Sequence, residues 1–167
     1  WMFSATMPRP IVKLINDQFC DPQMVKVTKQ ILTSDSIDQK FCVVRRHDMQ
    51  EALCRYLDFN QHTYTIVFAR TKAVVKELTD ELNMRGYPSD ALHGDMSQEQ
   101  RDLTMKKFKE KKIDLLICTD VAARGIDVTD LTHVINYSLP QDNESYVHRI
   151  GRTGRGGSKG IALSIIE

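Results

Sequence analysis

Arginine and glycine alternate in one short segment near the end of the chain, and this segment holds the densest set of side chains able to do chemistry. It reads H-R-I-G-R-T-G-R over residues 148–155, and residues 145–160 carry four cations and no acid. Arg149, Arg152 and Arg155 are three residues apart, so on a helix or a tight turn they project to roughly one side. A guanidinium donates in a planar fork that fits phosphate oxygens, and glycine lets the backbone approach a ligand closely. The segment predicts a phosphate-facing site; the alternative is a solvated basic loop.

A complete nucleotide-binding loop is absent from the sequence. Such a loop needs a lysine directly after a glycine, and the chain has no Gly-Lys pair; the order is reversed at Lys159-Gly160. No Asp-Glu pair follows an apolar strand to hold magnesium. The sequence therefore offers phosphate-facing arginines without a phosphate cradle.

Polar residues also follow three successive apolar runs. Arg70 and Thr71 come after the first, residues 93–95 (His-Gly-Asp) after the second, and Thr119 with Asp120 after the third. In a parallel sheet, ligands gather beyond the carboxyl ends of the strands, which is where these residues fall. Any one of them could simply cap a helix or form a turn, but their repetition favours a shared site.

Strands and helices alternate along the chain. Strands are predicted at 41–44, 65–69, 91–93, 115–119, 133–137 and 160–166, from short β-branched and apolar runs. Helices are predicted at 49–59, 74–84 and from Ser97 to Phe108, with Ser97 as N-cap, Gln100 at N3 and Gly86 as C-cap of the preceding helix. This order predicts an α/β fold with a parallel sheet and helices on both faces.

Composition excludes several other classes of protein. The chain has 167 residues, is 41% hydrophobic and 27% charged, and carries a formal net charge of +1, which is typical of one globular domain without a polybasic tail. Its four cysteines form no C-x-x-C pair, so we expect reduced thiols and no zinc or other metal site. No apolar run approaches the ~20 residues of a membrane span. We expect a cytoplasmic protein, cut from within a longer chain.

Four motifs, in this order, resemble the C-terminal RecA-like domain of DEAD-box RNA helicases, and the resemblance extends over residues 3–166. They are S-A-T at 4–6, L-H-G-D-M at 92–96 with Q-x-x-R at 98–101, T-D-V-A-A-R-G-I-D at 119–127, and the arginine-rich segment at 148–155. His148, in place of glutamine, resembles the DEAD-box branch rather than the DEAH branch. The surrounding segments are similar to bacterial members, including the cold-shock type. The resemblance implies a RecA-like three-layer domain whose mostly parallel sheet carries helices on both faces.

The resemblance implies roles at an ATP site shared with another RecA-like domain. By it, Arg152 and Arg155 match arginine fingers to the γ-phosphate, Gly125 and Asp127 match ATP-binding positions, and Ser4, Thr6 and His148 match residues of interdomain coupling. An arginine finger contributes ~10³–10⁵ in rate. Alternatively, Asp127 caps a turn, and Arg149 is expected to be a packing or ion-pair residue rather than a finger. The implied cofactor is ATP with Mg²⁺, bound mainly by the other domain.

The resemblance also implies contacts to single-stranded RNA. The matching positions are Arg70, Thr71, Gly94, Gln98, Arg101 and Thr119. These residue types bind backbone phosphates and include no aromatic platform for stacking bases, so they would grip RNA without reading its sequence. We expect Thr71 to cap the helix that follows it as well.

Residues 1–28 match the end of an upstream RecA-like domain and the interdomain linker, and residues 29–167 match the C-terminal domain. A helix is predicted from Pro8 to Phe19, with an apolar stripe formed by Ile11, Leu14, Ile15 and Phe19. Because its partner surface is expected to lie in the upstream domain, we expect residues 1–28 to dock on another molecule, exchange between copies or be mobile. Non-native self-association through this helix is one consequence.

The sequence thus predicts the second motor domain of an ATP-dependent RNA helicase, which would be an RNA-stimulated ATPase as the full-length protein and inactive as this chain alone. One alternative is an RNA-binding module that has lost the motor. The retained Arg152 and Arg155 argue against it, because phosphate fingers have little use without ATP. A DNA-translocating helicase of the same superfamily is the other alternative, and His148 disfavours it.

Overall fold

The first helix of the chain forms where its apolar stripe predicts it. In the computed structural model, which describes residues 7, 9–25, 36–61, 63–126, 128 and 130–167, α1 spans Arg9–Gln18. Ile15 on this stripe is buried, whereas Leu14 and Phe19 are exposed. α1 belongs to the first of two compact units, Trp1–Leu32 and Thr33–Glu167.

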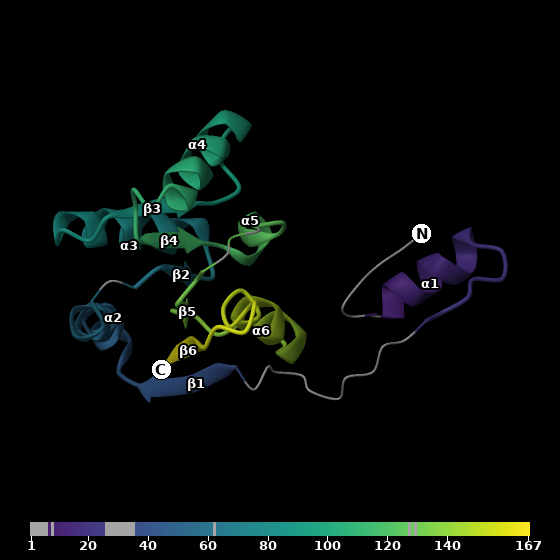
Figure 1. The fold of residues 1–167 in the computed structure, drawn as a ribbon, viewed down its shortest axis with the longest axis horizontal. Coiled ribbons are helices and arrows are strands. Elements are labelled where there is room, and N and C mark those ends of the chain that lie inside the picture. Colours follow the sequence, from purple (N-terminus) through teal and green to yellow (C-terminus); the bar gives the residue numbers. More distant parts are fainter. Residues whose placement is uncertain (1–6, 8, 26–35, 62, 127, 129) are drawn as a thin grey trace. The chain divides into compact units, whose positions relative to one another are not determined.

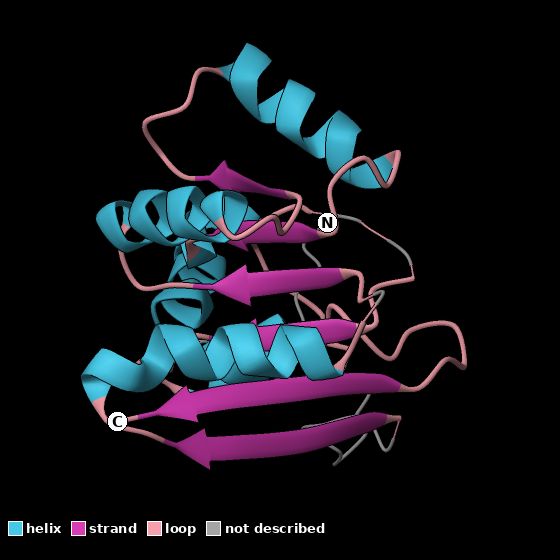
Figure 2. Ribbon diagram, turned by 90° about the vertical axis from the view of Figure 1, so that its left-hand side faces the viewer, coloured by secondary structure: helices cyan, strands magenta, loops and turns pink. Residues whose placement is uncertain are grey.

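The second unit is built on one six-stranded sheet. Its strands are β1 (Ile37–Val43), β2 (Thr65–Phe68), β3 (Ser89–Leu92), β4 (Leu115–Cys118), β5 (His133–Asn136) and β6 (Gly160–Ile166). Its helices are the short 3-10 helix η1 (Arg46–Asp48), α2 (Met49–Phe59), α3 (Lys72–Met84), α4 (Gln98–Lys109), α5 (Asp120–Ala123) and α6 (Asn143–Ile150). The strand order is β1-β6-β5-β2-β4-β3, and all pairs are parallel, so the arrows in Figure 2 point the same way.

Local capping chemistry fixes where the helices begin and end. The Ser97 side chain accepts a hydrogen bond from the Gln100 backbone N–H, and the Gln100 side chain accepts one from the Ser97 N–H, which completes the predicted capping box of α4. Thr71 caps α3 with one such bond, since its side chain accepts from the Val74 N–H. Gly86 follows α3 with φ +88°, a left-handed conformation that glycine adopts without steric cost.

Helices cover both faces of the sheet, as the alternation of strands and helices predicts. α2 and α3 pack on one face with Val67, and α4 and α5 pack on the other with Ile66 and Phe68. Figure 1 shows α2 on one side of the strands and α5 and α6 on the other. Every residue of β2 and β4 is buried, so these central strands are covered on both faces and, apart from Thr65, are apolar rather than alternating.

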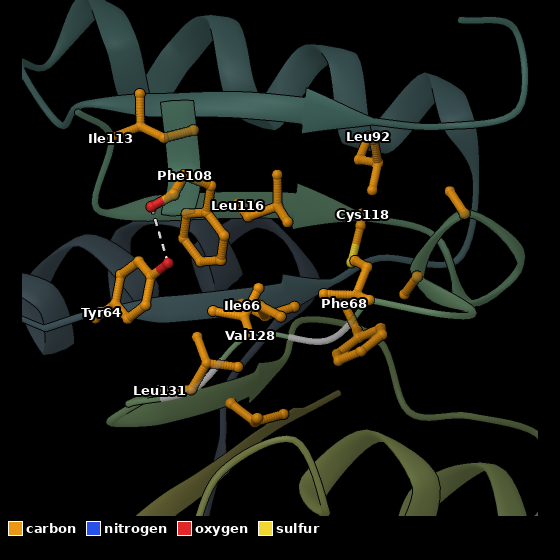
Figure 3. Packing of buried hydrophobic residues seen from close by; sticks show 14 residues of the cluster. Tyr64, Ile66, Phe68, Leu92, Phe108, Ile113, Leu116, Cys118, Val128 and Leu131 are labelled. Atoms are coloured by element: carbon orange, nitrogen blue, oxygen red, sulfur yellow. Dashed lines mark hydrogen bonds between the residues drawn. The ribbon is translucent and has the colours of Figure 1, made fainter. Parts of the chain in front are cut away.

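The cluster of buried residues around Tyr64 shows how α4 is fixed to the sheet (Figure 3). The Tyr64 hydroxyl donates to the Phe108 carbonyl at 2.8 Å, and the two ring centroids are 4.4 Å apart. Burial raises the pKa of Tyr64 to about 12, so it stays a neutral donor throughout the physiological range. The Phe108 carbonyl, in the last turn of α4, also accepts from the Lys111 N–H at 2.9 Å, so the Tyr64 hydroxyl adds a second bond that ties the end of α4 to the start of β2.

The edge strands differ most from the sequence prediction. β1 begins at Ile37 rather than at residue 41, and β3 covers Ser89–Leu92 rather than 91–93. The additional β1 residues include Asp38 and Lys40, which form an exposed ion pair of 3.0 Å. Edge strands tolerate such polar residues because one side lacks a neighbouring strand, and this removes the apolar signal that the prediction used.

Candidate functional site

Three adjacent strands bring the predicted polar residues to one rim of the sheet. Cys118, at the end of β4, is in register with the last residues of both β2 and β3. Thr119 therefore lies between the loop that carries Arg70 and Thr71 and the loop that carries Gly94. The sequence prediction that these strand ends share a rim is confirmed.

Helix starts add backbone N–H donors to this rim. The Thr71 hydroxyl accepts from the Val74 N–H at 3.3 Å at the start of α3, so Thr71 is the N-cap that the sequence predicts. Arg70, Thr71, Gly94 and Gln98 are exposed, and Thr119 is half-buried without a side-chain capping bond. The positive ends of α3 and α4 thus face the same exposed edge as a guanidinium and two hydroxyls, a combination suited to anionic oxygens.

Two polar contacts fix the loops of this rim. The Lys72 ammonium forms an ion pair with Asp95 at 2.9 Å, which joins the start of α3 to the loop after β3. Arg101 donates to the Ala122 carbonyl at 3.1 Å, so α4 is tied to α5. Gln98 donates to Asp102 on its own helix at 2.8 Å. Lys72 was not among the sequence candidates, because its relevance depends on a loop contact that spacing does not reveal.

A small pocket forms where α6 meets α5, and the arginine-rich segment lines it. Its lining residues are Phe68, Asp120, Ala123, Arg124, Ser145, His148, Arg149 and Arg152. The half-buried Arg152 donates to the Ile126 carbonyl at 2.8 Å. Ile126 follows Gly125, whose φ is +78° and whose Cα faces open space. The structure therefore brings Arg152 to the backbone beside the exposed Gly125, although Gly125 lies more than twenty residues before the arginine-rich segment.

Arg149 is buried and paired, as the sequence predicts for a packing or ion-pair residue. Its side chain is 3% exposed, and it donates to both carboxylate oxygens of Asp120, at 2.6 and 2.7 Å. It also donates to the Asn136 side chain at 3.0 Å and to the Ser138 carbonyl at 2.6 Å. Its guanidinium lies 5.0 Å from the centroid of the Phe68 ring. These contacts satisfy the buried charge and join α6 to the ends of β2, β4 and β5.

Arg155 extends beyond this pocket. It is exposed, and its Nε donates to the Gly151 carbonyl at 2.8 Å. The expectation that the three arginines share one side therefore holds for Arg149 and Arg152, which line the pocket, while Arg155 is not among the lining residues. The segment is helical only up to Ile150, and turns follow it, which separates Arg155 from the other two.

Packing rather than ligand approach accounts for one of the glycines in the arginine-rich segment. A Cβ at Gly154 would lie 2.7 Å from Ile37 Cγ1 and 2.8 Å from Ser36 Oγ. Its φ of +68° also disfavours any side chain. Gly154 thus allows the segment to pack closely against the start of β1, a reason that the motif alone does not disclose.

His93 lies at the end of β3, directly before Gly94. It is buried, and its Nδ1 has no hydrogen-bond partner among the described residues. Burial, reinforced by the positive charge of Lys76, lowers the pKa of His93 below its ordinary value of 6.5, so the ring is neutral at pH 7. A neutral ring places no additional cation beside the loop that carries Gly94.

Three sequence candidates, Ser4, Thr6 and Asp127, lie outside the described residues. Within the described ranges, no three His, Cys, Asp or Glu side chains form a group that could hold a metal ion. Nor do the helices described there include one that is long and apolar enough to cross a membrane.

Sequence reasoning missed the residues that hold Arg149. Asp120, Asn136 and Ser138 come from two separate strand ends, and α6 itself, which carries Arg149, was not predicted as a helix. One signal was available for Asp120, since a buried arginine needs an acidic partner and Asp120 lies two residues after the fully buried β4. For Asn136 and Ser138, only the strand order reveals the contact.

Comparisons with known proteins agree with the motifs. Residues 48–157 match the family model described as helicase conserved C-terminal domain. The DEAD-box ATP-dependent RNA helicase CshA of Bacillus cereus is 47% identical over 99% of this chain. The chain covers 31% of that protein, and it spans about a third of the length of the curated relatives it matches.

Solved structures of DEAD-box proteins share the fold. The Escherichia coli DEAD-box protein SrmB, solved bound to the regulator of ribonuclease activity A, is 39% identical with a TM-score of 0.73, and the match covers 78% of each chain. Saccharomyces cerevisiae Dbp5 bound to RNA and ADP BeF3 is 30% identical with a TM-score of 0.88, over 99% of this chain and 44% of that one. The sheet described above is therefore the RecA-like sheet of these proteins, and the chain belongs to the helicase C-terminal domain family, in its DEAD-box branch.

Proposed function

We propose that this chain is the second motor domain of an ATP-dependent DEAD-box RNA helicase. In this proposal, residues 29–167 act together with a preceding RecA-like domain of the same polypeptide, and the two domains close around ATP and RNA. Residues 1–28 would be the end of that preceding domain and the linker. The observation that carries the proposal is the position of Arg152, which is held at the Ile126 carbonyl beside the exposed Gly125.

The ATP side of the proposal assigns Arg152 and Arg155 as arginine fingers. Phosphoryl transfer spreads negative charge over the oxygens of the transferred group, and a guanidinium supplied from a second element stabilises that charge. Gly125 and Asp127 would contact the nucleotide, while Ser4, Thr6 and His148 would couple the two domains. His148 is exposed in α6, as a contact to another domain requires. ATP and its Mg²⁺ would be held mainly by the preceding domain.

The RNA side of the proposal uses the rim formed by β2, β4 and β3. Arg70, Thr71, Gly94, Gln98, Arg101 and Thr119 would bind the phosphates of a single strand. Their types support this, because hydroxyl, guanidinium, amide and backbone N–H groups all donate to phosphate oxygens and carry no information about base sequence. The related Dbp5 was solved bound to both RNA and ADP BeF3. This agrees with one domain that faces both ligands.

ATP and RNA would each favour the closed arrangement of the two domains, because both sites span the cleft between them. Each ligand should therefore tighten the binding of the other. Local separation of a duplex would follow from gripping one strand along its backbone. The proposal also includes a cytoplasmic location, where such a motor would meet cellular RNA.

Phosphate release from ATP, measured with and without single-stranded RNA, tests the proposal. It compares this chain alone with the two-domain protein, meaning the longer polypeptide in which these residues follow their ATP-binding domain. We expect the chain alone to be inert and the two-domain protein to be stimulated by RNA and much less by single-stranded DNA. A two-domain protein that binds RNA without stimulated hydrolysis would instead indicate a binding module without a motor, and preferential stimulation by DNA would indicate a DNA translocase.

A further inference from the structure

The Arg149–Asp120 pair lies between the two proposed ligand sites. Asp120 directly follows Thr119, at the end of β4, where RNA is proposed to bind. Arg149 precedes Arg152 by three residues, and both line the pocket beside α6. The fork between them, at 2.6 and 2.7 Å, is therefore a short direct connection from the RNA rim to the proposed finger.

The geometry of this pair resists relative motion. Two parallel hydrogen bonds between a guanidinium and a carboxylate fix an angle as well as a distance. The remaining Arg149 donor is taken up by Asn136 and Ser138, and the ring of Phe68 lies against the guanidinium. A shift at the end of β4 is thus transmitted to α6 instead of being absorbed by side-chain rotation.

We infer that Arg149 and Asp120 form a positioning pair that couples RNA bound at Thr119 to the placement of Arg152 at ATP. The inference rests on the proposed function and adds a role to two residues that contact neither ligand in it. Arg149 acts through Arg152, and Asp120 acts through Thr119. Removing the pair should uncouple the two sites while leaving each of them intact.

A second carboxylate in the same unit provides a matched control. Glu51 accepts from Arg55 and from Arg85, both at 3.0 Å, and its side chain is 45% exposed, the same fraction as that of Asp120. This cluster joins α2 to the end of α3 and includes none of the proposed ligand residues. Glu51→Gln therefore removes a paired charge of equal exposure without touching the proposed connection.

The test measures the RNA stimulation ratio of the two-domain protein, which is its ATPase rate at saturating RNA divided by its rate without RNA. For Asp120→Asn we expect the ratio to fall by about tenfold, within the roughly 5–150-fold range of typical couplings, with the rate in the absence of RNA unchanged to within about twofold. Asp120→Glu, which keeps the carboxylate, should recover part of the ratio. Arg149→Lys should lose it, since an ammonium cannot form the fork. Glu51→Gln should behave as wild type.

An unchanged stimulation ratio in Asp120→Asn would overturn the inference. This holds whether both rates persist or both fall equally, and an equal fall is the result that a purely structural role would give. Thermal melting of each variant identifies any loss of fold. If Asp120→Asn does not fold, Asp120→Glu supplies the test. A folded Asp120→Glu variant whose stimulation ratio does not exceed that of Asp120→Asn also contradicts the coupling role of the pair. Absence of RNA stimulation in the wild-type two-domain protein would overturn the proposed function itself, which separates the two failures.

Discussion

The three arginines of the 148–155 segment occupy three different environments. Arg149 is buried and forked to Asp120, Arg152 is half-buried at a carbonyl, and Arg155 is exposed. The sequence predicted the ion-pair character of Arg149 but could not name Asp120, because the partners lie 29 residues apart and meet only through the strand order. The finger roles of Arg152 and Arg155 stay proposals that rest on the motif and on the pocket.

Replacing Arg149 should destabilise the second unit. Arg149→Met removes four hydrogen bonds and leaves Asn136 and the Ser138 carbonyl without this donor, and we expect a loss of about 2–3 kcal/mol in the free energy of unfolding. Urea denaturation of the chain measures this. Arg55→Ala, which breaks an exposed pair, should cost less than about 1 kcal/mol. Equal effects of the two substitutions would contradict the account of Arg149.

Buried histidines make stability depend on pH. Burial lowers the pKa of both His93 and His133 below 6.5. Below about pH 6.5 the unfolded chain therefore binds more protons than the folded one, so stability falls with decreasing pH, whereas above that value the full stability is present. The shifted carboxylates titrate lower, from ordinary values of 3.8 and 4.5, and do not contribute in this window.

Urea midpoints at about pH 7.5 and about pH 5.5 test this dependence. The wild-type midpoint should be higher at the upper pH, and the variant with His93→Gln and His133→Gln should show a smaller difference between the two. If the variant keeps the full difference, other groups cause it.

At the scale of elements, the buried parts of the fold were the most predictable. The central strands β2, β4 and β5 are fully buried and carry apolar residues at their centres, and the caps of α3 and α4 follow from Thr71 and the Ser97 capping box. The polar half of β1 and the helix α6 were missed. β1 was missed in part because it is an edge strand with exposed residues. α6 was missed because one of its two buried residues is Arg149, so its sequence lacks a clear apolar stripe.

Two glycines of the second unit are expected to have different roles, one in packing and the other in the approach of a ligand. A Cβ at Gly160 would come within 2.6 Å of the Gly154 backbone N, whereas one at Gly94 would meet nothing within 4 Å. Gly160→Ala should therefore lower the free energy of unfolding by about 1–3 kcal/mol, and Gly94→Ala should change it by less than about 1 kcal/mol. The effects on RNA affinity of the two-domain protein should have the opposite order. Gly94→Ala should weaken RNA binding more than Gly160→Ala does. A strongly destabilised Gly94→Ala variant would argue that this loop is structural.

At the scale of the whole molecule, the chain consists of two compact units. All six strands and both faces of the core belong to Thr33–Glu167. The first unit carries α1 with the exposed Leu14 and Phe19. The sequence could predict the helix from its own stripe, but its proposed partner is a surface of another domain.

Removing residues 1–32 should leave the second unit folded. The truncated chain should keep the thermal transition of the sheet unit, and sedimentation should show it as a monomer, while the full chain self-associates through the 8–19 helix. Leu14→Ser in the full chain should weaken that association without changing the transition. A truncated chain that fails to fold, or that keeps the same association, would contradict the division into two units with separate roles.

The most direct test of the central claim is the ATPase rate of the Arg152→Ala variant of the two-domain protein at saturating ATP and RNA. Loss of an arginine finger should lower this rate by about 10³–10⁵-fold while RNA binding persists, because the finger acts on the transferred phosphoryl group. Lys159→Ala removes an exposed cation that lies four residues after the same segment and should leave the rate unchanged. An Arg152→Ala variant that hydrolyses ATP at the wild-type rate would contradict the assignment of this chain as the domain that supplies the finger.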